Sequence, residues 1–156
     1  MAAKTTVSYV GRTVDLYLFN DLPLTTPGVP MRLKPLPSGR IITGLEKAIQ
    51  RWVTLFLTPI GSVTSAPLAG SSFIPSVQSG AIQNVADIVT VFAAANAQVM
   101  EQLPVTDTMK LDEIIASVEL EDGSQVSPPN LYLRIKILTQ AGSSRVVTVP
   151  VSTVIR

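Results

Sequence analysis

One well-delimited helix, predicted over residues 43–57, constrains the fold of this chain more than any other segment. Thr43 and Glu46 have the spacing of a capping box, in which the hydroxyl accepts a first-turn amide and the carboxylate reaches back to the amide of Thr43. Apolar residues then recur at helical spacing and form one stripe: Leu45, Ile49, Trp52, Val53 and Phe56. Pro59 disfavours helical geometry at the residue before it and Gly61 permits a turn, so the helix must end before the proline.

A second helix is predicted from about Ser79 to Leu103, where Pro104 prevents it from continuing. Its larger apolar residues mark one face: Val85, Ile88, Val89, Phe92, Ala95, Val99 and Leu103. Alanines at 93–95 and 97 make the middle of the helix thin, so another helix could approach it closely. At about 36 Å this helix is long for a chain of this size, which favours packing in a helical bundle.

Two segments are predicted to form neither a helix nor a central strand. Residues 20–40 contain five prolines, which forbid a helix and favour an extended arm with polyproline character. The apolar residues of this arm make it too hydrophobic for a free linker, so we expect it to lie along another surface. Residues 58–79 are rich in Ser, Gly, Pro and Ala, with Phe73 as one large anchor. A loop this long usually binds a partner or becomes ordered in an assembly.

Apolar and polar residues alternate with period two in the C-terminal part, which predicts a small antiparallel sheet. One strand is expected over residues 114–120 and the clearest over residues 131–138, where four large aliphatic side chains share one face. Residues 141–144 make a hairpin to a strand over residues 146–149, and strand character continues over residues 151–156. Because this terminal strand outruns its hairpin, it is a candidate for pairing with the sheet edge of another chain.

These elements predict an α+β fold, in which two main helices pack with a small antiparallel C-terminal sheet and an extended proline-rich N-terminal arm precedes them. β-branched and aromatic residues from Thr13 to Phe19 add a short N-terminal strand. With 156 residues, the chain is long enough for one domain with a real core. We divide it into residues 1–40, the N-terminal strand and arm, and residues 41–156, the helical and β-hairpin domain.

Composition indicates that much of the surface is covered by protein partners. Apolar residues make up 46% of the chain and charged residues 15%, and the mean hydropathy is +0.38. Ordinary soluble domains have about a quarter of charged residues. A membrane span is the weaker explanation, because polar side chains interrupt the most apolar segment, residues 82–99, and the N-terminus lacks the pattern of a secretory signal. The net charge of +1 gives no broad attraction to nucleic acid.

The residue types that most catalytic sites need are missing. Cysteine and histidine are absent, which removes thiolate nucleophiles, sulfur-ligated metals and the commonest general base. Carboxylates remain, but Asp112 and Glu113 are neighbours that would point to opposite faces of a strand. Three further acidic residues within 119–122 are expected as solvated turn charges. The sequence therefore predicts no catalytic residue, no cofactor and no metal site.

Several residues are candidates for contact with other chains. Trp52, the one tryptophan, either packs in the core or anchors an interface, where aromatic residues concentrate. Arg40 and Arg51 flank the same helix and either meet a partner's carboxylates or lie on a free surface. Ordinary solubilising charges are expected on the last hairpin: Arg134, Lys136 and Arg145.

The amino-acid sequence of residues 41–73 resembles that of a known protein family. The chain reads Ile-Ile-Thr-Gly-Leu-Glu-Lys-Ala-Ile-Gln-Arg-Trp from Ile41, then Phe-Leu-Thr-Pro-Ile-Gly-Ser at 56–62 and Gly-Ser-Ser-Phe at 70–73. These residues are similar to those of the lysozyme-like baseplate wedge proteins of contractile-tail phages, the sheath initiators. Beyond residue 73 the resemblance lies only in the order of elements, a long helix followed by a terminal β-hairpin. Many members carry Glu-Pro-Arg at this loop to bind wedge helices. Here only Pro59 and Gly61 carry over.

The resemblance implies a non-enzymatic structural protein of the virion tail baseplate, present in the host cytoplasm during assembly. It would bind other wedge subunits through its helices and offer its C-terminal strand, over residues 145–155, to the tail sheath protein by β-augmentation, with the tail tube or hub as a further partner. The residues expected to contact partners are Arg40, Arg51, Trp52, Pro59, Gly61, Phe73, Arg145, Val147, Val149, Val151 and Val154. The alternatives are another connector, such as a tail-terminator or head–tail joining protein, and a peptidoglycan hydrolase.

Overall fold

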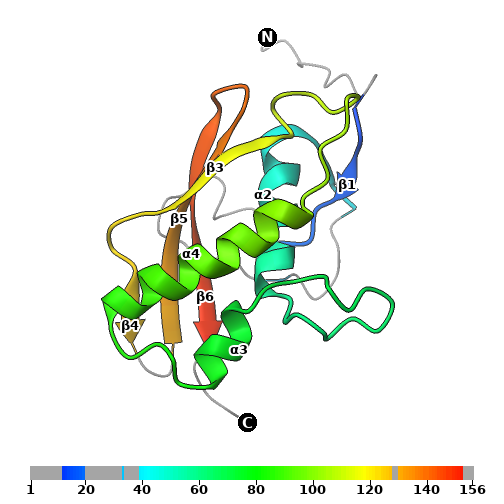
Figure 1. Cartoon of the computed structure of the whole chain (residues 1–156). Coiled ribbons are helices and arrows are strands. Elements are labelled where there is room, and N and C mark those ends of the chain that lie inside the picture. The colour runs from blue at the N-terminus through cyan, green and yellow to red at the C-terminus, as the bar shows by residue number, and fades with distance from the viewer. Residues whose placement is uncertain (1–11, 20–32, 34–38, 128–129, 153–156) are drawn as a thin grey trace.

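The computed structural model describes residues 12–19, 33, 39–127 and 130–152. Within them lie three helices and two small antiparallel sheets, which confirms the predicted α+β class (Figure 1). The helices are α2 (Gly44–Leu57), α3 (Phe73–Gln78) and α4 (Val85–Gln102). The strands are β1 (Asp15–Leu16), β2 (Ile41–Ile42), β3 (Ile115–Leu120), β4 (Gln125–Ser127), β5 (Asn130–Thr139) and β6 (Ser144–Ser152). Most of the proline-rich arm lies outside the described residues, as does Val154.

β5 is the central strand of the larger sheet. β6 pairs antiparallel with β5 along its whole length, from Asn130↔Ser152 to Leu138↔Ser144, while β3 and β4 share the other side of β5. The four aliphatic side chains predicted to share one face of β5 are fully buried: Leu131, Leu133, Ile135 and Ile137. The period-two pattern therefore placed this strand correctly, with one face on the core.

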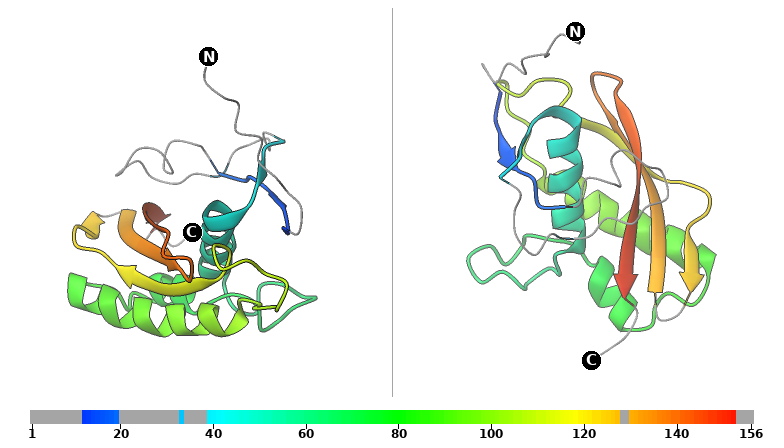
Figure 2. Two further views of the ribbon diagram at one scale, coloured as in Figure 1. Left: turned by 90° about the horizontal axis from the view of Figure 1, so that it is seen from above. Right: turned by 180° about the vertical axis from the view of Figure 1, so that it is seen from behind.

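The helices cover one face of this sheet (Figure 2). α4 lies across it next to β3, and α2 packs against both α4 and β5. Aromatic rings fill the space between them: Trp52 stacks on Phe56 with ring centroids 4.5 Å apart, and Phe56 also contacts Phe73 at 4.4 Å and Phe92 at 5.6 Å. These four side chains are at most 5% exposed. Full burial of one such side chain stabilises the fold by about 1.5–3 kcal/mol.

Residues 12–19 pack onto this core. β1 pairs with β2 over only two residues, so the strand predicted from Thr13 to Phe19 is shorter than expected. The side-chain amide of Gln50 takes the place of a longer ladder: its Oε1 accepts from the Leu18 amide at 2.8 Å, and its Nε2 donates to the Leu16 carbonyl at 2.7 Å. Tyr17 and Phe19, which flank Leu18, are buried in the core.

The capping box predicted for α2 is wrong. Thr43 occupies the N-cap position, but its side chain makes no cap hydrogen bond. Glu46 turns instead to Arg40, whose Nη2 donates to both carboxylate oxygens at 2.8 Å and 2.7 Å. The Arg40 guanidinium offers the carboxylate two charge-assisted hydrogen bonds, whereas a capping box offers it one from a backbone amide, and the two arrangements compete for the same carboxylate. The predicted bounds of the helix are otherwise correct within one residue.

A capping box does form at the second helix, and it shortens that helix. Asn84 Oδ1 accepts from the Asp87 amide at 3.0 Å, and Asp87 Oδ2 accepts from the Asn84 amide at 3.1 Å. α4 therefore begins at Val85 rather than at Ser79, and its 18 residues span about 27 Å instead of 36 Å. Six residues of the segment predicted as a loop form the short helix α3.

Candidate interaction edges and their supporting residues

The outer edge of β6 is free of strand pairing within the described residues. Its hairpin with β5 is closed by the Thr139 amide, which donates to the Ser143 carbonyl at 2.9 Å. From that pair, backbone groups of β6 point alternately toward β5 and away from it, as in any antiparallel ladder. The register therefore turns the amides and carbonyls of Val146 and Thr148 outward.

Pro150 has the same outward orientation as Val146 and Thr148. Proline has no amide to donate, and in sheets it is confined to edges and strand ends for that reason. At position 150 the missing amide would have faced away from β5, so the ladder to Tyr132 loses nothing. The outward backbone groups of β6 thus include donors and acceptors at Val146, which is partly exposed, and at Thr148, which is 6% exposed, and only an acceptor at Pro150.

The valines predicted as partner contacts face inward. Val147, Val149 and Val151 are 1%, 0% and 5% exposed and belong to the hydrophobic core. Their amides and carbonyls point toward β5. An incoming strand would therefore meet the even-numbered residues of β6, whereas the contact residues predicted within the described part of β6 are odd-numbered. Arg145 lies at the start of β6 with its Nη1 3.9 Å from Glu46 Oε1.

Trp52 and Phe73 are core residues. Neither has any exposed surface, and the Trp52 Nε1 donates to Asn96 Oδ1 at 2.9 Å. Of the two roles considered for Trp52, the structure supports packing. Arg40 is exposed, but it already binds Glu46 and its guanidinium lies 5.0 Å from the centre of the Tyr17 ring.

The loop between α2 and α3 is held in place by residues that sequence reasoning missed. Gln102 of α4 brackets Gly70, accepting from its amide at 2.8 Å and donating to its carbonyl at 2.7 Å. Gln98, one turn earlier, accepts from the Ser72 amide at 2.8 Å. Two glutamines at i and i+4 on a helix were the available signal, because they share one face. Pro59 forms an isolated bridge with Ser71.

Positive φ favours glycine at both positions 70 and 61, but only position 70 also lacks space for a Cβ. Gly70 has φ of +108°, and a Cβ built there would lie 2.2 Å from the Thr58 carbonyl oxygen. Gly61 has φ of +82°, but a Cβ there would meet nothing within 4 Å. Gly61 is exposed near the base of the loop, one residue after Ile60, whose amide donates to the Ser71 carbonyl at 3.0 Å.

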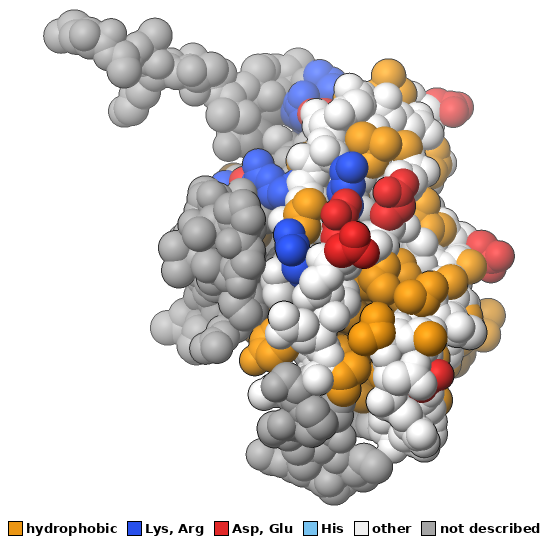
Figure 3. All heavy atoms as spheres, turned by 90° about the vertical axis from the view of Figure 1, so that its left-hand side faces the viewer, with side chains coloured by type: hydrophobic (Ala, Val, Ile, Leu, Met, Phe, Trp, Pro, Cys, Tyr) orange, Lys and Arg blue, Asp and Glu red, His pale blue; other side chains and the backbone are white. Residues whose placement is uncertain are grey.

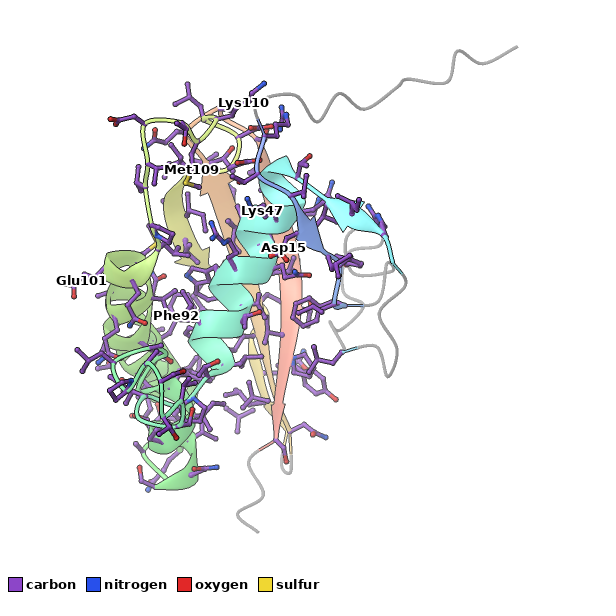
Figure 4. All side chains as sticks on the ribbon, turned by 90° about the vertical axis from the view of Figure 1, so that its right-hand side faces the viewer. Asp15, Lys47, Phe92, Glu101, Met109 and Lys110 are labelled. Atoms are coloured by element: carbon purple, nitrogen blue, oxygen red, sulfur yellow. The ribbon has the colours of Figure 1, made fainter. Side chains whose placement is uncertain are left out.

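Among the predicted contact residues, Arg51 has a charged group that is not neutralised by a partner within the described part of the chain. It is partly exposed and forms no hydrogen bond or ion pair within the described part of the chain. It lies between two hollows of about 360 and 340 Å³, both also lined by Asp15 and Pro104. The next basic residue on the same face is Lys47, one helical turn earlier (Figure 4).

Lys47 and Glu113 form a buried ion pair beneath this surface. Lys47 Nζ lies 3.9 Å from Glu113 Oε2 and contacts Thr13 Oγ1, while the Gly44 amide donates to Glu113 Oε1 at 3.4 Å. Burial lowers the pKa of Lys47 from its usual 10.5, an effect that the charge of Glu113 opposes and that of Arg51 reinforces. This cluster joins α2, the N-terminal segment and the turn before β3.

The adjacent carboxylate, Asp112, has a similar structural role. Its Oδ2 accepts from Arg12 Nη1 at 2.7 Å. Asp112 and Glu113 each hold a cation of the same chain and do not face each other across a cleft, so a pair of glycosidase carboxylates is not assembled here. Among the described residues, no three His, Cys, Asp or Glu side chains are grouped to hold a metal ion.

Comparison with known proteins finds no family, curated protein or solved structure that matches this chain. The helices in the described ranges are too short or too polar to cross a membrane. The fold defines a small α+β protein in which β6, like β3, has one side without a strand partner among the described residues. The functional assignment depends on that side of β6 and on the surfaces around α2 and α4.

Proposed function

We propose that this chain is a structural subunit of a contractile-tail baseplate that binds wedge subunits and initiates the tail sheath by strand pairing at β6. The observation that carries the proposal is the outer edge of β6, where the amides and carbonyls of Val146 and Thr148 point away from β5 and have no strand partner among the described residues. Main-chain hydrogen bonds of this kind supply affinity in β-augmentation, and the flanking side chains set the register. The sequence of residues 41–73 supplies the resemblance to sheath initiators.

The geometry restricts where a partner strand could pair. Residues 144–148 offer both donors and acceptors, whereas Pro150 offers no donor, so we expect pairing to be centred before the proline. This is a narrower segment than the 145–155 inferred from sequence. The buried valines of β6 would support this edge, because their packing anchors the strand in the core.

The wedge-facing role is assigned to the loop around Gly61 and to Arg51. The loop tip is exposed, yet its base is fixed by Gln98 and Gln102, a combination that allows a loop to bind without large ordering costs. Arg51 supplies an unpaired cation for a carboxylate of a wedge subunit. The tail tube or hub is a further candidate partner. In this role the protein would reside in the virion tail baseplate and, during assembly, in the host cytoplasm.

Val146→Pro tests the strand-pairing step. This substitution removes an amide that faces away from β5, so the fold should persist while a partner strand loses a donor and meets the proline ring. Val146→Thr is the matched control, because it keeps the amide and the β-branched shape. Each variant is co-expressed with the sheath-type protein whose gene lies nearest to that of this chain. The measurement is the amount of sheath-type protein that co-purifies with the variant.

We expect the threonine variant to retain the sheath protein and the proline variant to lose it, with matching circular dichroism spectra. Equal recruitment by a folded Val146→Pro variant would overturn pairing at β6. The absence of sheath and tube genes beside the coding sequence would count against the baseplate role itself. Size-exclusion chromatography separates the connector alternative, because a ring-forming connector should oligomerise alone.

A further inference from the structure

The solvent-facing side of α4 is apolar. Seven residues of this helix are exposed before Glu101: Val85, Ala86, Val89, Thr90, Ala93, Ala94 and Ala97. Only Thr90 among them has a polar side chain, and Val85 and Val89 are 55% and 53% exposed. A surface helix normally turns charged and polar residues outward. This apolar strip extends about 18 Å along the helix, and exposed apolar surface of this kind marks an interaction site.

Four residues of this strip, Val85, Val89, Ala93 and Ala97, lie in one wall of a groove with a volume of about 600 Å³. β3 and the turn after it, residues 118–124, form the other wall. Phe92 and Val118 contribute nearly buried side chains to the lining. Ala93 and Ala97 keep the α4 wall low, so the backbone of another helix could come close to α4.

The wall opposite α4 is acidic. Glu119, Glu121 and Asp122 line the groove, and none of them forms an ion pair within the described residues. No Lys or Arg lines it. Lys136 is the cross-strand partner of Glu119, and the Arg134 side chain lies against Gly123. Figure 3 shows this side of the molecule, where acidic side chains lie between hydrophobic ones and a few Lys and Arg side chains.

The groove suits a helix better than a strand. The Val118 carbonyl, which faces out from β3, already accepts a hydrogen bond from Asn96 Nδ2 at 3.4 Å. A strand adding to β3 would have to displace this side chain of α4. A helix satisfies its own backbone groups and needs only side-chain contacts with the groove.

We propose that this groove binds an amphipathic helix of another protein, with small and apolar residues facing α4 and Lys or Arg facing Glu119, Glu121 and Asp122. A second copy of this chain is a poor occupant, because the charged residues of α4, Asp87 and Glu101, are both acidic and would approach the acidic wall. The inference does not rest on the baseplate proposal, since the charge and shape of the groove are the same in any assembly.

The test uses two synthetic 18-residue helical peptides without tryptophan, which share one Ala/Leu face and carry Lys or Glu on the other face. Trp52 is the sole tryptophan of the chain and donates to Asn96, which lines the groove, so its emission reports on binding. Fluorescence anisotropy of labelled peptides gives the affinities. Val89→Lys and Thr90→Lys form a matched pair, because both add one cation to an exposed position of α4 and only Val89 lines the groove.

We expect the basic peptide to bind the wild-type protein, with salt weakening the interaction, and the acidic peptide to bind at least about tenfold more weakly. Val89→Lys should weaken the basic peptide by about tenfold and Thr90→Lys by less than about twofold. Glu119→Gln combined with Asp122→Asn should remove most of the salt dependence. Equal binding of both peptides, equal effects of the two lysine variants, or no binding at all would overturn the proposal. Self-association that Val89→Lys abolishes would assign the groove to a second copy instead.

Discussion

The Trp52 Nε1 donates a hydrogen bond to Asn96 Oδ1 across 2.9 Å, and this bond joins the buried face of α2 to α4. Trp52 is fully buried, so its indole N–H has no access to water. Asn96 also donates to the Val118 carbonyl, which ties α4 to β3. One amide side chain therefore links both helices and the sheet.

Asn96→Ala should destabilise the protein by about 1–3 kcal/mol, because it leaves a buried indole donor unsatisfied. Urea unfolding followed by circular dichroism measures the loss. Trp52→Phe removes the donor itself, so in a double-mutant cycle the cost of Asn96→Ala should shrink in the Trp52→Phe background. An undiminished cost would show that the hydrogen bond does not contribute to stability.

Gly70→Ala and Gly61→Ala should differ sharply in effect. Both glycines have positive φ, so each alanine carries a backbone cost of about 1 kcal/mol. At position 70 the new Cβ also collides with the Thr58 carbonyl, 2.2 Å away, whereas position 61 is open. Thermal unfolding should show a much lower Tm for Gly70→Ala. Equal shifts would mean that the loop relaxes around the new methyl group.

Lys47 should make stability depend on pH in the alkaline range. Its pKa is lowered from 10.5 in the folded protein, mainly by burial, so the folded state releases this proton before the unfolded state does. Unfolding then takes up a proton. The free energy of unfolding should therefore rise between the folded pKa and 10.5, and lose this contribution as the pH falls through the folded pKa.

Lys47→Arg is the matched variant for this measurement, because arginine keeps the positive charge and does not titrate in this range. Urea unfolding of both proteins at several alkaline pH values gives the difference in slope, and the titration of the tyrosines cancels in the comparison. The wild-type protein should gain stability relative to Lys47→Arg as the pH rises. Parallel pH profiles would contradict the lowered pKa.

Proline substitutions at neighbouring positions of β6 should differ in their cost to stability, because one removes an amide that faces β5 and the other removes an amide that faces away. Val147→Pro removes an amide that faces β5 and a side chain that is 1% exposed, so it should cost about 3 kcal/mol or more. Val146→Pro removes an outward amide and should cost far less. Hydrogen exchange of β5 amides gives an independent measure. Similar losses for both variants would place the register one residue away from the one described.

Local pattern predicted the elements whose signal lies within a few residues. The period-two alternation of β5 needs only neighbouring residues, and the core face was read correctly from Leu131 to Ile137. The body of α2 follows from its apolar stripe and Pro59. The parity of β6 could not be read in the same way, because Val146, Val147, Val149 and Val151 are all apolar and alternation is interrupted there.

Contacts between residues that are not neighbours in the sequence determine the features that local pattern did not predict. Glu46 is three residues after Thr43, the spacing of a capping box, yet Arg40 and Arg145 converge on it in space. Gln98 and Gln102 find the loop before α3 only after α4 has docked. The groove between α4 and β3 likewise exists only when the sheet has formed.

Periodicity and proline placement act over one or two turns or strands, and they were enough to predict the α+β class, the bodies of the two main helices and the buried face of β5. The free edge of β6, the exposed face of α4 and the core position of Trp52 follow only from the folded arrangement of these elements. Those outcomes depend on burial and pairing between segments far apart in the chain, and no local pattern encodes the distance between two side chains that meet only after folding.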